Sequence, residues 1–306
     1  MKSISYVLMT PARNEEQHIA DLLQAVVAQT LLPQKWIIIS DGSTDRTDDI
    51  IQDYARQHSF IQYLRTEPDS SRNFASKVYA LQKAWVLLEP LNYDFIGNLD
   101  ADVMPEPNYF ENLLAYFHRN PQLGIGGGVI VEDHDGNWLP QYNASSLNVA
   151  GAVQLFRRSC FEQIGGYQPL PCGGVDAFAD LLARMHGWQV RSFTDLTVKH
   201  HRITGTEARS LLAARMGEGR LEYAFGYHPL FEMAKLLARI AEKPRVIGGL
   251  ARLWGFMRAW WGAEQIVISS DAVAWLRREQ LSRLFPFISA PEPKKPVSHS
   301  SAPEAS

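Results

Sequence analysis

Two aspartates separated by one residue, Asp100 and Asp102, are the side chains of this sequence best suited to bind a divalent cation. In an extended chain, residues i and i+2 project to the same side, so both carboxylates would face one site. Carboxylate oxygens, water and substrate phosphates are the ligands that Mg²⁺ and Mn²⁺ prefer. The same residues could instead belong to a loop that caps a helix starting near Pro105. The pair alone leaves both interpretations open.

Two other polar segments, Thr10–Glu16 and Asp41–Asp45, have the composition of loops between a strand and a helix. Gly42 permits a tight turn after Asp41, whose carboxylate could accept a hydrogen bond from the N–H of a nucleobase. Pro11 stiffens the other turn. Each segment is equally well explained as the start of a helix, because hydroxyl and acidic side chains cap and stabilise the first helical turn.

Strands and helices alternate around these segments. Short apolar runs rich in β-forming residues predict buried strands at residues 4–10, 36–40, 60–64 and 93–99. Apolar residues at helical spacing predict helices at residues 15–29, 45–57 and 75–88. This order predicts an α/β fold with a mostly parallel sheet and right-handed crossovers. Ligands of such sheets bind outside the carboxyl ends of the strands, and all three polar segments follow a strand.

The middle of the chain contains a run of three glycines and further predicted elements. The pattern predicts a hairpin turn at Asp135-Gly136, a helix at 175–186 and a strand at 189–193. Gly127 and Gly128 leave backbone amides accessible. They do not form a P-loop, because no Gly-Lys-Ser/Thr follows them.

The last third of the chain is expected to be helical. The spacing predicts helices at residues 206–241 (bent at Gly226 or Pro229), 246–261 and 271–284. Residues 246–261 are apolar apart from Arg252 and Arg258, and are fewer than the roughly 20 apolar residues that span a bilayer. Tryptophan and arginine together suit a membrane interface, while packing against the protein and a true membrane span are the alternatives. Residues 287–306 are rich in proline and serine and are expected to be disordered.

The charge distribution is uneven. The formal net charge is −3, but residues 202–283 hold 13 Lys/Arg against 8 Asp/Glu. A basic, tryptophan-rich segment indicates an anionic partner such as a membrane surface. A solvated basic face would have the same composition, so both interpretations stay open.

Two features bear on the cellular compartment. Cys160 and Cys172 are too few to form a disulfide framework or a zinc site. The apolar run at the start of the chain is too short for a secretory signal. We therefore expect a cytoplasmic protein, or one that is peripheral on the inner face of the cell membrane.

The three polar segments, in this order and each after a strand, resemble family 2 glycosyltransferases of the GT-A fold. That family opens with a segment like Pro-x-x-Asn-Glu-Glu, here Pro11–Glu16. It continues with Asp-Gly-Ser-Thr-Asp, here Asp41–Asp45, and with a strand-end Leu-Asp-Ala-Asp, here Leu99–Asp102. The resemblance covers about residues 5–201. It implies a GT-A domain over 1–203, with a nucleotide-sugar half at about 1–103 and an acceptor half at about 104–203, followed by a helical extension over 204–286.

The resemblance also implies roles for individual residues. The nucleotide-sugar site would comprise Pro11, Arg13, Glu15, Asp41, Arg72, Lys77 and Asp100. Asp41 would hold the base, often uracil in this family, and Asp100 would face the ribose or the diphosphate. Mn²⁺ or Mg²⁺ would be bound by Asp102, with Asp100 and His200 as further ligands. Arg72 and Lys77 could instead lie on a solvated helix face, and His200 could be structural. On the acceptor side, Gly127 and Gly128 could line the site, and Trp138 could stack on an acceptor sugar or pack in the core.

The catalytic base is also assigned from the resemblance. Family members carry an acidic pair, then a helix and Gly-Trp, here Gly187-Trp188. Counting back, Asp176 falls on the second acid of the pair, and Val175 replaces the first. Asp180 is the rival, although an ion pair with Arg184 four residues later would explain it without catalysis. The base would take a proton from an acceptor hydroxyl as that oxygen attacks the anomeric carbon of the sugar.

These features together predict an inverting glycosyltransferase that uses a nucleoside diphosphate sugar, with a UDP-sugar favoured. The acceptor would be a polysaccharide, a lipid-linked glycan or another cell-envelope glycan, and no nucleic acid is expected as a partner. A degenerate nucleotide-sugar-binding protein is the main alternative. A sugar nucleotidylyltransferase would need a glycine-rich loop after the first strand, and Thr10–Asn14 lacks those glycines.

Overall fold

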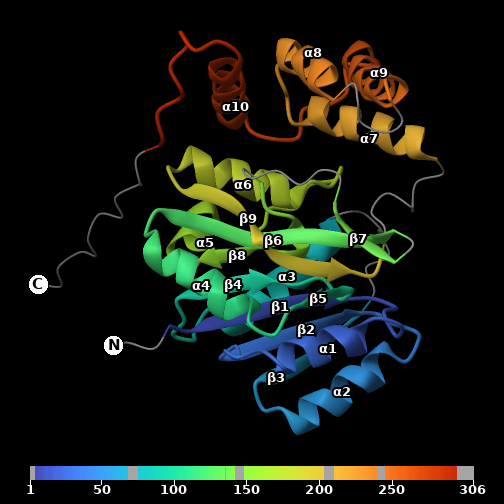
Figure 1. Ribbon diagram of the computed structural model, residues 1–306, viewed down its shortest axis with the longest axis vertical. Helices are drawn as coiled ribbons and strands as arrows, with labels where there is room; N and C mark the ends of the chain where they lie inside the picture. The colour runs from blue at the N-terminus through green and yellow to red at the C-terminus, as the bar shows by residue number, and fades with distance from the viewer. Residues whose placement is uncertain are drawn as a thin grey trace, which may run out of the picture.

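A nine-stranded sheet forms the centre of the protein in the computed structural model, which describes residues 4–67, 75–134, 136–141, 148–202, 210–239 and 245–294. The strand order is β3-β2-β1-β4-β8-β6-β9-β5, and β7 pairs with β6 outside this path (Figure 1). The strands are β1 (Tyr6–Ala12), β2 (Lys35–Asp41), β3 (Ile61–Thr66), β4 (Phe95–Asn98), β5 (Val103–Pro105), β6 (Leu123–His134), β7 (Asn137–Pro140), β8 (Leu155–Arg157) and β9 (Gln189–His200).

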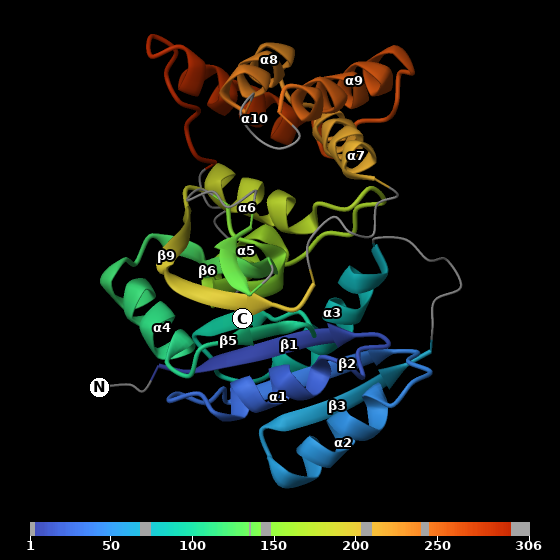
Figure 2. The same cartoon turned by 45° about the vertical axis from the view of Figure 1, so that its right-hand side comes forward.

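The first half of the sheet is parallel and packed on both faces. β3, β2, β1 and β4 run in the same direction. Nearly all residues of β1, β2 and β4 are buried, because α1 and α2 cover one face and α3 covers the other (Figure 2). These helices are α1 (Ile19–Val27), α2 (Thr47–Gln57) and α3 (Ala75–Leu88). The α/β fold with a mostly parallel sheet, predicted from the alternation of elements, is confirmed here.

The second half of the sheet mixes strand directions. The three-residue strand β8 runs antiparallel to both β4 and β6, whereas β6 and β9 are parallel to each other. β5 pairs antiparallel with the end of β9, which places Val103 opposite His200. The strand predicted at 189–193 therefore continues to His200, beside the chain that follows β4. The helices of this half are α4 (Tyr109–Arg119), α5 (Arg158–Ile164) and α6 (Val175–Met185).

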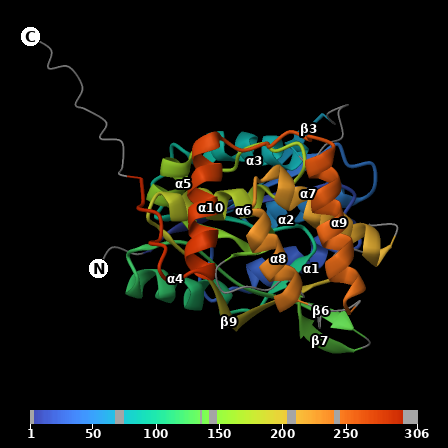
Figure 3. The ribbon, with the colours of Figure 1, turned by 90° about the horizontal axis from the view of Figure 1, so that it is seen from above.

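Four C-terminal helices form a separate layer over α6 (Figures 2 and 3). They are α7 (Leu211–Ala224), α8 (Pro229–Ala238), α9 (Ile247–Trp261) and α10 (Ser270–Leu284). The prediction of one bent helix over 206–241 is wrong. The chain leaves the helix at Gly226, which has a φ of 69°, and α8 begins anew at Pro229 behind the capping side chain of His228. In the part of the chain that the structure describes, no helix has the length and apolarity needed to cross a bilayer.

A second apolar cluster joins this layer to the sheet domain. It contains Phe178 and Leu181 of α6, Phe225 at the end of α7, and Ala272 and Leu276 of α10. Of the predicted disordered tail, residues 295–306 lie outside the described residues. The part before them runs along α10 and reaches α6.

Candidate active site

The polar segments that follow β1, β2 and β4 meet at the carboxyl edge of the sheet. They surround a cavity of about 810 Å³ whose lining includes Pro11, Arg13, Glu15, Asp41, Lys77, Asp100, Asp102 and Arg202. These segments come together because β2 and β4 flank β1 in parallel and end beside it. The cavity thus includes every predicted nucleotide-sugar residue except Arg72, which lies outside the described residues.

Asp41 is fixed by bonds between the loops that surround it. Asn14 adopts a left-handed backbone conformation (φ 54°), and its Oδ1 accepts a hydrogen bond from the Thr44 N–H at 2.8 Å. Arg13 Nη1 lies 3.5 Å from Asp41 Oδ2, and the Thr66 hydroxyl lies 3.4 Å from Asp41 Oδ1. Asp41 also borders a neighbouring cavity of about 480 Å³. The carboxylate is therefore held at a junction large enough for a planar ring.

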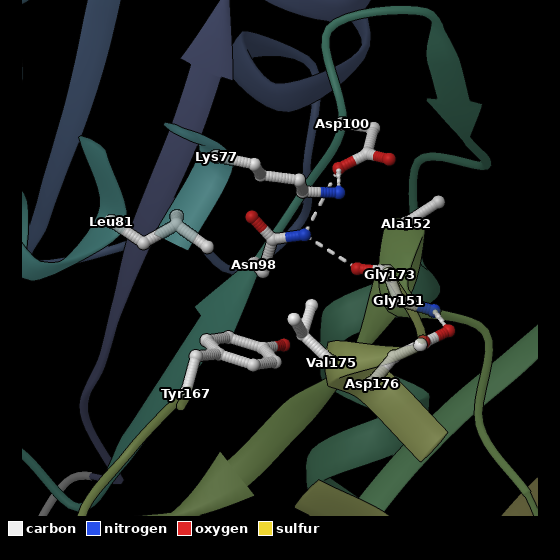
Figure 4. A pocket seen from close by; sticks show the side chains of 11 residues that line it. Lys77, Leu81, Asn98, Asp100, Gly151, Ala152, Tyr167, Gly173, Val175 and Asp176 are labelled. Carbon is white, nitrogen blue, oxygen red and sulfur yellow. Dashed lines mark hydrogen bonds and ion pairs between the residues drawn. The ribbon is translucent and has the colours of Figure 1, made fainter. Parts of the chain in front are cut away.

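Asp100 is held by a lysine and an amide (Figure 4). Lys77 Nζ lies 2.6 Å from Asp100 Oδ1, and Asn98 Nδ2 donates to the same oxygen at 3.0 Å. Lys77 belongs to α3, and Asn98 is the last residue of β4. The half-buried ammonium is placed to meet a second anion in the cavity. Asn98 was not predicted as a site residue. An amide side chain at the end of an otherwise apolar strand is the sequence feature that could have indicated it.

Asp102 lines the same cavity as Asp100 but has different partners. The β5–β9 pairing brings His200 Nε2 to 3.2 Å from Asp102 Oδ2, and Arg202 Nη1 to 3.5 Å from it. Burial by itself would raise the pKa of Asp102, but His200 and Arg202 outweigh it and hold the pKa below its usual value. Burial would lower the pKa of His200, and the neighbouring carboxylates, Asp102 first, raise it instead.

The donor set suits a divalent cation that is only partly bound by protein. Among the described residues, no group of three or more His, Cys, Asp and Glu side chains is arranged to hold a metal ion by itself. Asp102 and His200 offer one carboxylate and one imidazole, which are Mn²⁺ ligands. His200 Nδ1 is buried without a hydrogen-bond partner, with Glu132 Oε1 3.8 Å away. Such a sparse site fits an ion that takes its other ligands from water and substrate phosphates.

Asp176 faces the same region from α6. It lines a cavity of about 310 Å³ together with Lys77, Asn98 and Asp100 (Figure 4). The Gly151 N–H donates to Asp176 Oδ2 at 3.1 Å, which fixes the half-buried side chain. A carboxylate in this position is accessible from the cavity and can accept a proton there.

Asp180, one turn further along α6, lies in a different environment. It is fully buried, and it accepts hydrogen bonds from the Val149 N–H and from Gln154 Nε2, both at 2.9 Å. Burial raises its pKa well above the usual range. Arg184, the expected partner, bonds to Glu279 of α10 at 2.9 Å. Asp180 therefore connects the helix to the loop before β8, and it also borders the chamber between the sheet domain and the C-terminal helices.

A family comparison agrees with the geometry of this site. The model of the family described as Glycosyl transferase family 2 matches residues 7–170, more than half of the chain. The chain belongs to this family. Its structural neighbours are glycosyltransferases too, and they identify the fold as GT-A.

One relative and two structural neighbours show how far the likeness of this chain to known proteins extends. The glucosyl-dolichyl phosphate glucuronosyltransferase of Haloferax volcanii is 22% identical over 182 residues, which are 54% of this chain and 55% of that protein. The mannosyltransferase PcManGT from Pyrobaculum calidifontis, in complex with GDP-Man and Mn²⁺, has a TM-score of 0.54 at 18% identity, covering 93% of this chain and 82% of that one. S. aureus TarS 1–349 in complex with UDP-GlcNAc has a TM-score of 0.53 at 12% identity, covering 94% and 82%. The chain spans about half the length of the Haloferax relative.

Of the residues predicted for the acceptor side, Gly127 and Gly128 are closely packed within β6, and Gly128 also borders the chamber between the sheet domain and the C-terminal helices. A Cβ at Gly127 or Gly128 would come within 2.5 Å of neighbouring atoms. The Gly128 N–H donates to the Tyr109 hydroxyl at 2.8 Å. The prediction of an accessible amide is therefore wrong for Gly128, because that amide is already bonded within the core. Trp138 lies on β7 and is 40% exposed.

Another chamber, of about 590 Å³, lies between the sheet domain and the C-terminal helices. Asp100, Gly128, Asp176, Asp180 and His200 line it on the sheet side. The helices contribute charged residues, including Glu222, Lys235, Arg239, Arg252 and Glu279. No local sequence pattern predicts this chamber, because its two walls are far apart along the chain.

Proposed function

We propose that this chain transfers a sugar, with inversion, from a nucleoside diphosphate sugar to a hydroxyl acceptor, assisted by Mn²⁺ or Mg²⁺. One observation carries the proposal. Asp176 shares a cavity with Lys77 and Asp100, while Asp41 and Asp102 line the adjoining cavity at the same edge of the sheet. Groups able to bind a base, an anion and a metal thus surround one space, together with a group able to accept a proton.

The donor would lie along the 810 Å³ cavity, from Asp41 to Asp100. Asp41 would accept a hydrogen bond from an N–H of the base. The ammonium of Lys77 would balance the charge of the diphosphate. A UDP-sugar is favoured, since TarS 1–349, a structure of the same fold, is in complex with UDP-GlcNAc. A GDP-sugar is the alternative, because PcManGT is in complex with GDP-Man.

Asp102 and His200 would hold the divalent ion, with Asp100 on the same cavity wall. The ion, when bound, would neutralise charge that develops on the leaving diphosphate. PcManGT, a structure of the same fold, is in complex with Mn²⁺, which supports the use of a divalent ion.

Asp176 would act as the catalytic base. Its carboxylate would take the proton of the acceptor hydroxyl while the hydroxyl oxygen forms a bond to the anomeric carbon. The bond between that carbon and the diphosphate oxygen breaks in the same step, and the diphosphate leaves with the electron pair. Attack opposite the leaving group inverts the anomeric centre. The Gly151 N–H, bonded to Oδ2, would hold the base in place.

The acceptor would approach through the 590 Å³ chamber, because Asp176 lines it as well. Its charged walls suit a polar head group such as a glycan or the head of a lipid-linked acceptor. The Haloferax relative, named a glucosyl-dolichyl phosphate glucuronosyltransferase, supports a lipid-linked acceptor. Residues 1–203 would then form the catalytic unit, and residues 204–286 would close the acceptor side.

Donor hydrolysis tests the proposal without knowledge of the acceptor. The full chain is incubated with Mn²⁺ and UDP-glucose, UDP-N-acetylglucosamine, UDP-glucuronic acid or GDP-mannose, and the free nucleoside diphosphate is measured. Slow release of UDP or GDP, with water as acceptor, is the expected result. If UDP raises the melting temperature but every donor stays intact, the chain is a nucleotide-sugar-binding protein instead. Formation of a nucleoside triphosphate on addition of pyrophosphate would indicate a nucleotidylyltransferase.

A further inference from the structure

Helices α7, α8 and α9 bury several charged side chains between them. Glu222 of α7 forms an ion pair with Arg252 of α9, and Lys235 of α8 bonds to the same carboxylate. Glu232 of α8 is only 3% exposed, and Arg215 of α7 is 7% exposed. Helices that pack in water usually bury apolar residues and expose charged ones. The interior of this three-helix unit is ionic instead.

The outward faces of α8 and α9 are apolar. Ile247, Leu250, Trp254 and Trp261 lie at positions i, i+3, i+7 and i+14 of α9, and each is more than half exposed. Leu230, Met233 and Leu237 repeat the spacing i, i+3, i+7 on α8, and Leu237 is 67% exposed. Residues at this spacing form one stripe along a helix. We call these seven side chains the apolar face.

Two glycines let α7 and α9 pack closely against each other, and the large apolar residues lie on the outer surface. A Cβ at Gly219 would lie 1.9 Å from the carbonyl oxygen of Arg252, and one at Gly255 would lie 2.1 Å from that of Met216. Small residues between helices, polar bonds within and large apolar residues outside are typical of helices that contact lipid. The unit therefore has the polarity of a membrane-contacting structure.

Positive charge borders the apolar face. Arg258 is exposed on α9, four residues after Trp254 and three before Trp261, and Arg245 is exposed just before the helix. The acidic residue of α8 is the buried Glu232, and α9 has none. The sequence pattern was ambiguous because Arg252 and Arg258 lie on different sides of α9. The structure resolves this, since Arg252 pairs inside the unit and Arg258 faces out.

We infer that α8 and α9 dock through the apolar face on an anionic phospholipid surface, with α9 lying along the membrane. The 15 residues of α9 are about 22 Å long, short of the roughly 30 Å hydrocarbon core. Trp254 and Trp261 enter the head-group region, and Arg258 meets lipid phosphates. Figure 1 shows the unit at one end of the molecule, opposite α1 and α2, so the sheet domain does not block this contact. The inference goes beyond the proposed transfer reaction and does not depend on it.

Vesicle cosedimentation tests this inference. The full chain is mixed with vesicles of phosphatidylcholine containing about 30% phosphatidylglycerol, or of phosphatidylcholine alone. We expect wild-type protein to sediment with the anionic vesicles, and Trp254→Ser combined with Trp261→Ser to lower the partition coefficient by about tenfold or more. Arg258→Gln should lower binding to the anionic vesicles about fivefold and change binding to neutral ones little. Val86→Ser, at a 65% exposed apolar residue of α3, is the matched control and should bind like wild type.

Several results of these experiments would overturn the docking inference. Absence of wild-type sedimentation, or equal sedimentation of the double tryptophan variant with an unchanged melting temperature, overturns the inference. The wild-type protein could be a dimer that does not bind vesicles, and the double variant a monomer. That result would assign the apolar face to contact with a second copy of the chain and would also overturn the inference. Donor hydrolysis in vesicle-free buffer is expected to be the same in both proteins. If the wild-type protein does not hydrolyse any donor, the proposed function is refuted, and the docking result is unaffected.

Discussion

The pair of variants Asp176→Asn and Asp180→Asn separates a chemical role from a structural one. Asp176 is half-buried and lines the cavity that contains Lys77 and Asp100. Asparagine has nearly the same shape, and its carbonyl oxygen can still accept the Gly151 N–H bond. It cannot take a proton from an acceptor hydroxyl. Asp176→Asn should therefore keep the donor site and lose the reaction.

The expected loss follows from the size of general-base effects. A positioned base contributes about 10²- to 10⁴-fold to the rate. At ~1.4 kcal/mol per factor of ten, this corresponds to roughly 3–5.5 kcal/mol of transition-state stabilisation. The kcat for UDP release from the best donor should fall by about this factor in Asp176→Asn, while the affinity for UDP stays within about threefold of wild type.

Asp180→Asn should show the opposite pattern. Two donors, the Val149 N–H and the Gln154 amide, already point at Asp180, so an asparagine NH₂ group would face one of them. An unmatched buried donor costs about 1–3 kcal/mol of stability. The melting temperature should fall, and kcat should stay close to wild type. An inactive but folded Asp180→Asn, together with an active Asp176→Asn, would refute the assignment.

Further predictions concern the donor site and the helical unit. Lys77→Met should raise the donor KM about tenfold, because the ammonium beside Asp100 balances the diphosphate charge; an unchanged KM would place Lys77 outside the site. Asp41→Asn should weaken UDP binding about tenfold in calorimetry, and equal affinity would exclude a base contact. Burial and the charge of Glu222 raise the pKa of Glu232 to about 8 from 4.5, so stability present below pH 4.5 is lost as the pH rises toward 8. Glu232→Gln should therefore raise the melting temperature more at pH 8.5 than at pH 5, and equal shifts would contradict the raised pKa.

The nucleotide half of the fold was predictable because local signals agree there. β1, β2 and β4 are short apolar runs, and each ends in the polar segment that the sequence placed after it. The order of strands and helices then fixes a parallel arrangement, in which strand ends share one edge. Asp41, Asp100 and Asp102 could be placed together on this reasoning alone.

The acceptor half was less predictable because long-range pairing builds it. β8 has only three residues, Leu155–Arg157, which is too few for a periodic pattern. The approach of His200 to Asp102 depends on β9 pairing with β5, and no local signal specifies that register. The sequence around Gly226 does not distinguish a break from a bend, because a single glycine does not reveal whether the helix continues. The inward charges of α7–α9 satisfy one another only after the helices pack.

A nucleoside diphosphate and a divalent ion are proposed to bind together at the carboxyl edge of the sheet. Calorimetric titration of UDP, with Mn²⁺ and with EDTA, into wild-type protein and Asp102→Asn tests this joint binding. We expect at least about tenfold tighter UDP binding with Mn²⁺ in wild type, and loss of that gain in Asp102→Asn, which removes the charge beside His200. Equal UDP affinity with and without Mn²⁺ in wild type, or absence of both UDP and GDP binding, would contradict it.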